Sequence, residues 1–195
     1  MASLFHRPKP SALSGSPWWA GILPWVVFGV AQEWCPPLAG PLALAVFALA
    51  YWRTRLTLPA LDAGIAAYFL IYSLISLTGL EQKMPPRILF ALCPAVLAIT
   101  AALSVAVGQP FTLAYARQYA PEHIQGRPSF FLANQIITLL WVAGFATAAI
   151  TIGSLRAEWN PAQAAIILIS ALGAAMVASA ATGFWFHTRE SRVTT

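Results

Sequence analysis

Charged residues are scarce in this chain. Only 9% of its 195 residues are Asp, Glu, Lys or Arg, whereas about 25% are charged in an ordinary soluble domain. Hydrophobic residues account for 59% of the sequence, and the mean hydropathy is +0.70. This composition excludes a water-soluble globule. About six spans of roughly 20 residues would fill most of the chain, which leaves no room for a second, soluble domain.

Residue types that commonly carry chemistry are also few. The two cysteines, Cys35 and Cys93, have neither the number typical of a disulfide framework nor the spacing of a metal knuckle. His6, His123 and His187 lie outside or at the end of the apolar runs, so no histidine pair faces the core at haem- or zinc-ligating spacing. The sequence also lacks a Gly-x-Ser-x-Gly elbow, a P-loop and a lysine within an apolar run. We therefore expect no catalytic residues, no metal and no cofactor, and hence no enzyme.

What the chain does contain is a series of apolar runs. Their lengths suit helices, because an open backbone cannot satisfy its hydrogen bonds in lipid. We predict an all-α, polytopic membrane protein with a single membrane domain, tails at 1–17 and 188–195, and six transmembrane helices at residues 18–34, 38–52, 60–80, 88–107, 130–153 and 162–186. Tryptophans fall at the predicted ends, where an indole ring is stabilised in the membrane interface: Trp18, Trp19, Trp34, Trp52, Trp159 and Trp185.

The first two runs leave an alternative open. They are short, they contain Pro24 and Pro41, and only a few residues join them. Residues 18–52 are therefore interpreted either as two spans or as one re-entrant hairpin.

The basic residues are scattered between the apolar runs and give a net charge of +5. In a membrane protein such residues orient the chain and contact anionic headgroups, so we expect the lipid bilayer as their partner and no nucleic acid. With six spans, eight basic residues fall on one side of the membrane: Arg7, Lys9, Arg53, Arg55, Arg117, Arg127, Arg189 and Arg192. Lys83, Arg87 and Arg156 fall on the other side. The positive-inside rule then predicts that both termini lie in the cytoplasm.

The longest loop, residues 108–129, is predicted to contain a short amphipathic helix. Apolar and aromatic side chains recur every four residues after Pro110, whereas Arg117 projects from another face. Pro121 is expected to end this helix, which would lie along the cytoplasmic interface. We interpret five side chains of the loop as a candidate interaction surface for headgroup phosphates or an acidic partner: Phe111, Tyr115, Arg117, Tyr119 and Arg127. The alternative is a helix that only plugs the cytoplasmic end of the bundle.

Asp62 is the clearest polar residue inside a predicted span, where a charge is costly and is usually paired or wet. Tyr72 and Ser76 share its helical face. One interpretation is a proton or cation site. The other is a first-turn acid stabilised near the positive end of the helix, and a salt bridge to Arg53 or Arg55 fits both.

Two further polar residues, Asn134 and Thr138, share one face of a predicted span with Trp141. We expect an interhelical hydrogen bond here, because polar side chains commonly link helices in lipid, with a binding pocket as the alternative.

Small residues recur at helical spacing in the last span. Ala171, Ala175, Ser179 and Gly183 lie on one stripe, and such stripes let helix backbones approach closely. The stripe favours packing within the bundle, with a dimer interface as the alternative.

The long loop and the span that follows it resemble a known family. The matching residues are the string Gly108-Gln109-Pro110-Phe111, then Tyr115-Ala116-Arg117, then Arg127-Pro128, Phe130, Asn134, Thr138 and Trp141. This pattern resembles the signature loop and following helix of the intracellular septation protein A-like proteins of the bacterial inner membrane. The resemblance covers residues 108–141, and the first hundred residues match in hydropathy only. The chain is less rich in lysine than the septation proteins proper, which indicates a distant relative.

The resemblance implies a multi-pass protein of the bacterial inner (cytoplasmic) membrane that is connected with cell-envelope synthesis or division through protein partners. It carries over no catalytic residue. It favours a non-catalytic membrane scaffold or accessory subunit. The alternative is a small secondary transporter or channel that uses Asp62 as an intramembrane ionisable site, which would suit first spans that contain prolines.

Overall fold

The computed structural model describes residues 19–54, 60–155 and 160–193, and within these ranges every regular element is a helix. The prediction of an all-α protein is therefore confirmed. The long helices are α1 (Trp19–Trp34), α2 (Pro36–Thr54), α3 (Ala60–Leu77), α4 (Pro86–Ala106), α7 (Pro128–Ser154) and α8 (Pro161–Val193). The short elements are the 3₁₀ helix η1 (Leu80–Lys83), α5 (Phe111–Tyr119) and α6 (Glu122–Gln125).

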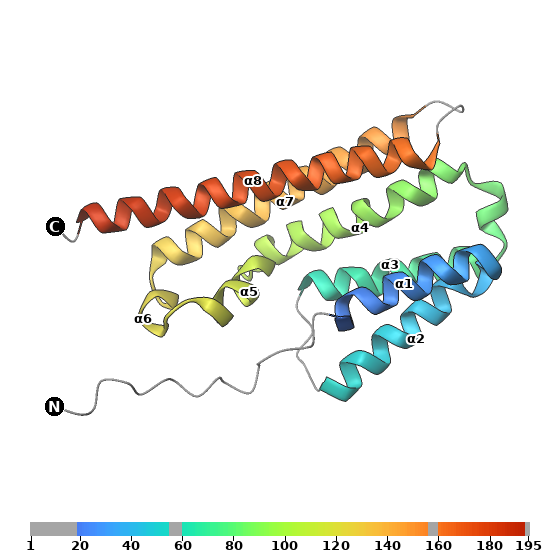
Figure 1. Ribbon diagram of the computed structural model, residues 1–195, viewed down its shortest axis with the longest axis horizontal. Coiled ribbons are helices and arrows are strands. Elements are labelled where there is room, and N and C mark those ends of the chain that lie inside the picture. The colour runs from blue at the N-terminus through green and yellow to red at the C-terminus, as the bar shows by residue number, and fades with distance from the viewer. Residues whose placement is uncertain (1–18, 55–59, 156–159, 194–195) are drawn as a thin grey trace.

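The long helices run back and forth along one axis of the molecule (Figure 1). α1, α3 and α7 point in one direction, and α2, α4 and α8 return in the other. We call the end that carries α5 and α6 the α5 end, and the opposite end, with η1 and the turn between α1 and α2, the η1 end. Helices that follow one another along the chain pack together, and α4 packs against α7 once the short α5 and α6 have been passed.

Four helices are long and apolar enough to cross a membrane, namely α3, α4, α7 and the Ala162–Phe186 part of α8. By length and composition, these four helices indicate a helical membrane protein. α1 has only 16 residues, and the apolar part of α2, Pro36–Trp52, is also short, so helix length does not confirm the predicted count of six spans. α8 continues beyond the last predicted span as far as Val193.

Prolines mark the start of several helices. The first residues of α2, α4, α7 and α8 are Pro36, Pro86, Pro128 and Pro161. Proline suits the first helical position, because its missing N–H has no partner there anyway and its fixed φ fits a helix. Hydropathy alone predicts that the corresponding spans begin one or two residues later, at 38, 88, 130 and 162. Pro24 and Pro41 lie inside α1 and α2, which continue through them.

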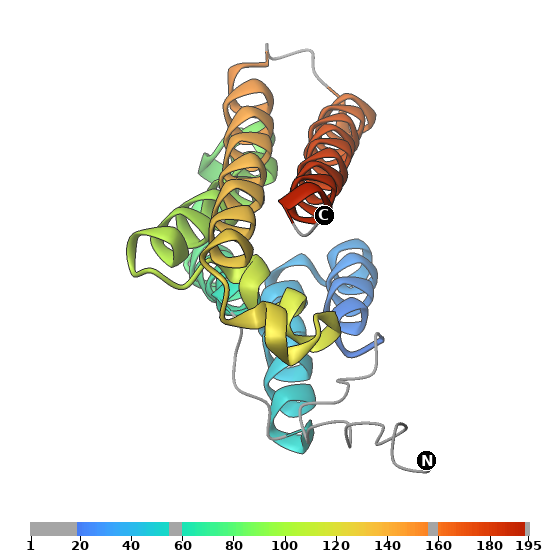
Figure 2. The same cartoon turned by 90° about the vertical axis from the view of Figure 1, so that its left-hand side faces the viewer.

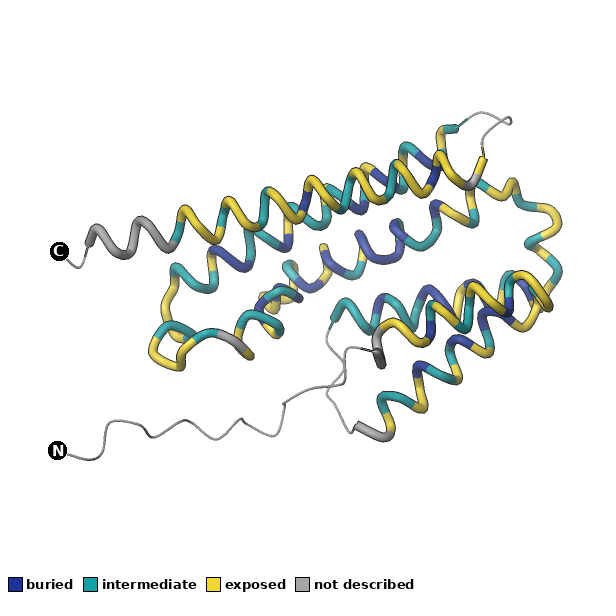
Figure 3. Tube along the Cα trace, viewed as in Figure 1, coloured by how far each residue is buried: buried dark blue, intermediate teal, exposed yellow. Residues whose placement is uncertain are grey.

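Aromatic rings fill the space between α1 and α3. Trp25 packs on Phe69 with ring centroids 4.9 Å apart, and Phe28 meets Tyr72 edge to face at the same distance. The buried positions of α4 and α7 include smaller side chains, such as Ala101. Figure 3 shows the buried residues on the facing sides of α3, α4 and α7, whereas much of α8 is exposed. An exposed apolar helix face of this kind suits contact with lipid.

α3 lies very close to both of its neighbours. A Cβ placed on Gly40 of α2 would lie 2.9 Å from the backbone nitrogen of Ser73 in α3. A Cβ on Gly64 of α3 would lie 2.9 Å from Oγ1 of Thr100 in α4. These contacts leave no room for a larger residue unless one of the helices shifts.

The stripe of small residues on α8 packs against α7. A Cβ on Gly144 of α7 would lie 3.2 Å from both the carbonyl oxygen of Ala171 and the Cβ of Ala175. Ala175 is buried by this contact. At Ala171 and Ala175 the stripe therefore packs within the bundle, which is the interpretation that the sequence favoured over a dimer interface.

We expect Gly40→Ala to lower the free energy of unfolding by about 1–3 kcal/mol, because the new methyl group would overlap the backbone of Ser73. Gly29→Ala is the matched control, since Gly29 is also helical and a Cβ there meets nothing within 4 Å. Thermal unfolding of the two variants in detergent, followed by circular dichroism, tests this. Equal midpoints for both variants would contradict close α2–α3 packing.

Candidate functional site

Polar side chains gather at the two ends of α3. Asp62 lies in its first turn and Ser76 in its last, about 21 Å apart at 1.5 Å per residue. We call Tyr51, Asp62 and Tyr115 the Asp62 cluster. The group at the η1 end is called the Glu81 cluster, and its members are Gln32, Tyr72, Ser76 and Glu81.

The Asp62 cluster joins three helices at the α5 end. The hydroxyl of Tyr51, from the last turns of α2, donates a hydrogen bond to Oδ2 of Asp62. Tyr115 of α5 is a second hydrogen-bonding side chain of the same carboxyl group. Asp62 itself is half-buried. The carboxyl group therefore holds α2, α3 and α5 together at one point.

Tyr115 lies outside the candidate membrane-spanning helices. Burial raises the pKa of its phenol above the ordinary value, and the neighbouring Asp62 raises that pKa further through its charge and hydrogen bond. A phenol is protonated at neutral pH even at its ordinary pKa, and the upward shift keeps it so over a wider pH range. It is therefore suited to donate a hydrogen bond to Asp62.

The expectations for Asp62 are met in part. It is a first-turn acid of α3, where the positive end of the helix stabilises a carboxylate. Tyr72 and Ser76 do not surround it, because they lie about three or four turns further along the same helix. Its partners are tyrosines of other helices. The salt bridge that the sequence suggested between Asp62 and Arg53 or Arg55 involves arginine side chains that lie outside the described part of the structure.

The Glu81 cluster joins α1, α2, α3 and η1 at the opposite end. The Tyr72 hydroxyl donates to Oε1 of Gln32 at 3.0 Å. The Ser76 hydroxyl donates to Oε2 of Glu81 at 2.6 Å, and the carbonyl oxygen of Pro36 lies 3.3 Å from it. Tyr72 and Ser76, predicted as intramembrane polar residues, therefore pair with Gln32 and Glu81, which the sequence analysis had not selected.

A third polar contact attaches α5 to α7. Oγ1 of Thr112 donates to the backbone oxygen of Asn134 at 2.8 Å and lies 2.9 Å from Oγ1 of Thr138. The interhelical hydrogen bond expected at Thr138 is therefore present. The Asn134 side chain instead bonds within its own helix, donating to the carbonyl oxygen of Phe130 at 2.8 Å. Sequence analysis missed Thr112, the residue that joins the two helices.

α5 has the two faces that its sequence predicts. Phe111 is only 5% exposed, and its ring lies edge-on to Trp141 with centroids 6.5 Å apart. Arg117 and Arg127 are exposed. The predicted helix end at Pro121 also holds, since α5 ends at Tyr119, whose side chain lies outside the described residues.

The exposed charged and long polar side chains of α5, α6 and the turn that follows lie close together in the sequence. Nε2 of Gln125 donates to the carbonyl oxygens of Arg117 and Ala120, at 3.0 and 2.8 Å, and thereby ties α6 to the end of α5. We call this the α5–α6 surface, and its exposed residues are Arg117, Gln118, Glu122, His123 and Arg127.

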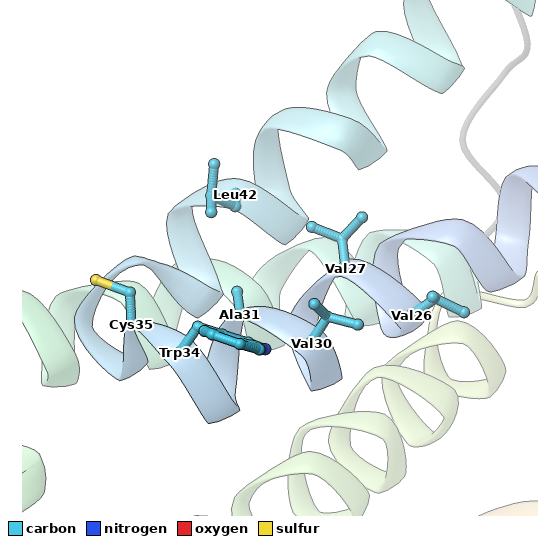
Figure 4. Close-up of a pocket in the computed structure, with 7 residues that line it drawn as sticks. All are labelled: Val26, Val27, Val30, Ala31, Trp34, Cys35 and Leu42. Carbon is cyan, nitrogen blue, oxygen red and sulfur yellow. The ribbon is translucent and has the colours of Figure 1, made fainter.

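A shallow pocket between α1 and α2 offers different chemistry (Figure 4). Its lining is apolar apart from the thiol of Cys35. It contains no member of the Asp62 or Glu81 cluster and no charged side chain. Within the described ranges, no group of three or more His, Cys, Asp or Glu is arranged to hold a metal ion.

These features define a helical membrane protein with a carboxyl cluster near one end and an ordered polar surface across that end. No family model matches the chain, and no curated protein or solved structure matches it either. The resemblance to the septation protein A-like proteins therefore stays a prediction from residues 108–141.

We expect Thr112→Val to lower the free energy of unfolding by about 1 kcal/mol, because valine keeps the shape but loses the hydrogen bonds to α7. Thr78→Val is the control, since the Thr78 hydroxyl is exposed and bonds only to carbonyls of its own helix. Denaturant unfolding in detergent measures both. The double variant Thr112→Val/Thr138→Val should lose less free energy of unfolding than the sum of the losses in the two single variants. Strictly additive losses would contradict a hydrogen bond shared by the two residues.

Proposed function

We propose that this protein is a non-catalytic, multi-pass membrane protein that acts as a scaffold or accessory subunit through the α5–α6 surface. The observation that carries the proposal is the division of α5 into a buried, anchored side and an exposed, basic side. Phe111, Thr112 and Tyr115 make the anchoring contacts. Arg117, on the same helix, is exposed.

An anchored surface has an advantage for recognition. Binding by a flexible loop costs conformational entropy, whereas a surface already held in place avoids most of that cost. Hydrogen bonds fix both α5 and α6, so their exposed side chains start from a defined arrangement. Arginine is also a residue type enriched in protein interfaces. These points support a role for the surface in binding another protein.

The charges of the surface favour an acidic partner. Arg117 and Arg127 are basic, and Glu122 is the acidic residue beside them. Each basic contact near an anionic surface contributes about 1 kcal/mol. We propose an acidic segment of a membrane-associated protein as the partner, with anionic headgroups contributing at the edge.

Six spans with both termini in the cytoplasm form part of the proposal. The hydrogen bonds of Tyr51 to Asp62 and of Tyr72 to Gln32 align α2 and α1 with opposite ends of α3. α2, with 19 residues, is as long as the 18-residue α3, and α1, with 16, is only slightly shorter, which supports two further spans over a re-entrant hairpin. The α5 end would then be cytoplasmic, because the more numerous basic residues lie on that side.

The septation protein A-like resemblance supports a link with cell-envelope processes in the bacterial inner membrane. Several of the residues that carry it belong to one contact region, since Phe111 faces Trp141 and the Thr112 hydroxyl meets Thr138. The motif thus corresponds to the attachment of α5 to α7.

Photo-cross-linking in cells tests the scaffold proposal. A photoreactive amino acid in place of Gln118 should capture a discrete protein partner, because Gln118 is exposed beside Arg117. Arg117→Glu should reduce that capture roughly fivefold or more, as one favourable charge contact becomes repulsive. Lys83→Glu, a charge reversal at the exposed η1 end, is the matched control and should leave capture unchanged.

A thiol-labelling control checks the orientation in the same cells. Cys35 is exposed at the turn between α1 and α2, so a membrane-impermeant maleimide added outside the inner membrane should label it. Gln118→Cys should be protected. Capture that persists in a correctly inserted Arg117→Glu protein would remove the recognition role of the surface.

A small secondary transporter or channel is the second candidate. The Asp62 cluster favours it, because a half-buried carboxyl group in a membrane helix is a common ion or proton site. Proteoliposomes should then show a proton flux that Asp62→Asn abolishes and that Glu33→Gln, at an exposed carboxylate, does not. Flux at the level of empty liposomes would exclude this candidate for protons.

A further inference from the structure

α5 lies across the α5 end of the bundle (Figure 2). Its Tyr115 interacts with Asp62 from that side, while Tyr51 holds the same carboxyl group from α2. The two phenols therefore make chemically similar contacts to one group from different helices. Only one of those helices, α5, is a short segment outside the candidate membrane spans.

The backbone bends on both sides of α5. Gly108 has φ of +73°, a left-handed conformation that glycine adopts far more readily than other residues. Ala120 is extended, and Pro121 separates α5 from α6. Bends on both sides of a short helix are what such a segment needs in order to move as a unit, as lids over active sites do.

The first turn and the middle of α5 are held by different parts of the protein. At its first turn, the Phe111 N–H donates to Oγ of Ser104 in α4 at 3.1 Å, and Thr112 bonds to α7. One turn later, Tyr115 reaches Asp62 of α3. The first turn therefore forms a pivot, and the Tyr115–Asp62 interaction must break for the rest of α5 to move away from α3.

We propose that α5 is a hinged lid over Asp62, pivoting on its first turn and closed by the Tyr115 hydroxyl. The closed lid limits the access of water and small cations to the half-buried carboxyl group. The open lid exposes the carboxyl group to the aqueous phase at the α5 end. This inference goes beyond both proposed functions, and the closed lid is the state in which the α5–α6 surface has the arrangement described above.

Chemical modification of carboxyl groups in the purified full-length protein tests the lid. A water-soluble carbodiimide with glycine ethyl ester labels carboxyl groups that water reaches, and mass spectrometry measures each site. Glu122 is exposed on α6 and should be modified readily, which provides an internal standard. Asp62 should be modified much more slowly. Tyr115→Phe, which keeps the ring and removes the hydroxyl, should raise the Asp62 rate about tenfold, since one hydrogen bond to a charged group is lost.

Tyr51→Phe is the matched control. It removes the other phenol hydrogen bond from the same carboxyl group but leaves α5 in place, so the Asp62 rate should stay near the wild-type value. Amide hydrogen exchange across Phe111–Tyr119 gives a second readout and should quicken in Tyr115→Phe alone. Equal responses of the two variants in both measurements would overturn the proposal, as would a wild-type Asp62 that reacts as fast as Glu122.

Discussion

Close approach of helix backbones is the constraint on which this bundle depends. Lipid tails are as apolar as leucine side chains, so helices in a membrane gain little by hiding apolar surface from water and depend on dispersion and shape. The chain meets this constraint with Gly40 against Ser73 and with Gly144 against Ala175. At these contacts one added methyl group would meet atoms of the neighbouring helix. The register of α3 with α2, and hence the partners available at each end of α3, follows from this fit.

Polar side chains then acquire partners from neighbouring helices, since little water reaches them in a membrane. At one end of α3, Asp62 takes phenol donors from α2 and α5. At the other end, Ser76 donates to Glu81. The two ends differ in one respect that matters for function. The Glu81 cluster is built from long helices and the tight turns between them, whereas the Asp62 cluster includes a short helix with bends on both sides.

The sequence predicted those features that depend on local pattern. Apolar runs predicted the long helices, and the four-residue recurrence around Tyr115 predicted α5 and its two faces. The pairing of Asp62 with Tyr51 escaped prediction because it depends on how two helices align. A helical wheel predicted Tyr72 on the face of Asp62, but a wheel carries no distance along the helix axis, and Tyr72 pairs with Gln32 of α1 instead. The number of spans stayed open because α1, with 16 residues, is near the lower limit of length for a membrane helix.

The helices of this bundle differ in apolar length, and the surrounding bilayer must adapt to that difference. α3 has 18 residues and is about 27 Å long, whereas the 25-residue apolar stretch of α8 is about 37 Å long. A hydrocarbon layer about 30 Å thick fits the first closely and is too thin for the second. α8 must therefore tilt or thicken the lipid beside it, at a modest cost for each ångström of mismatch. The lipids beside α8 must therefore adapt in a way that lipids beside a shorter helix need not, so the neighbouring lipids differ around the circumference of the protein.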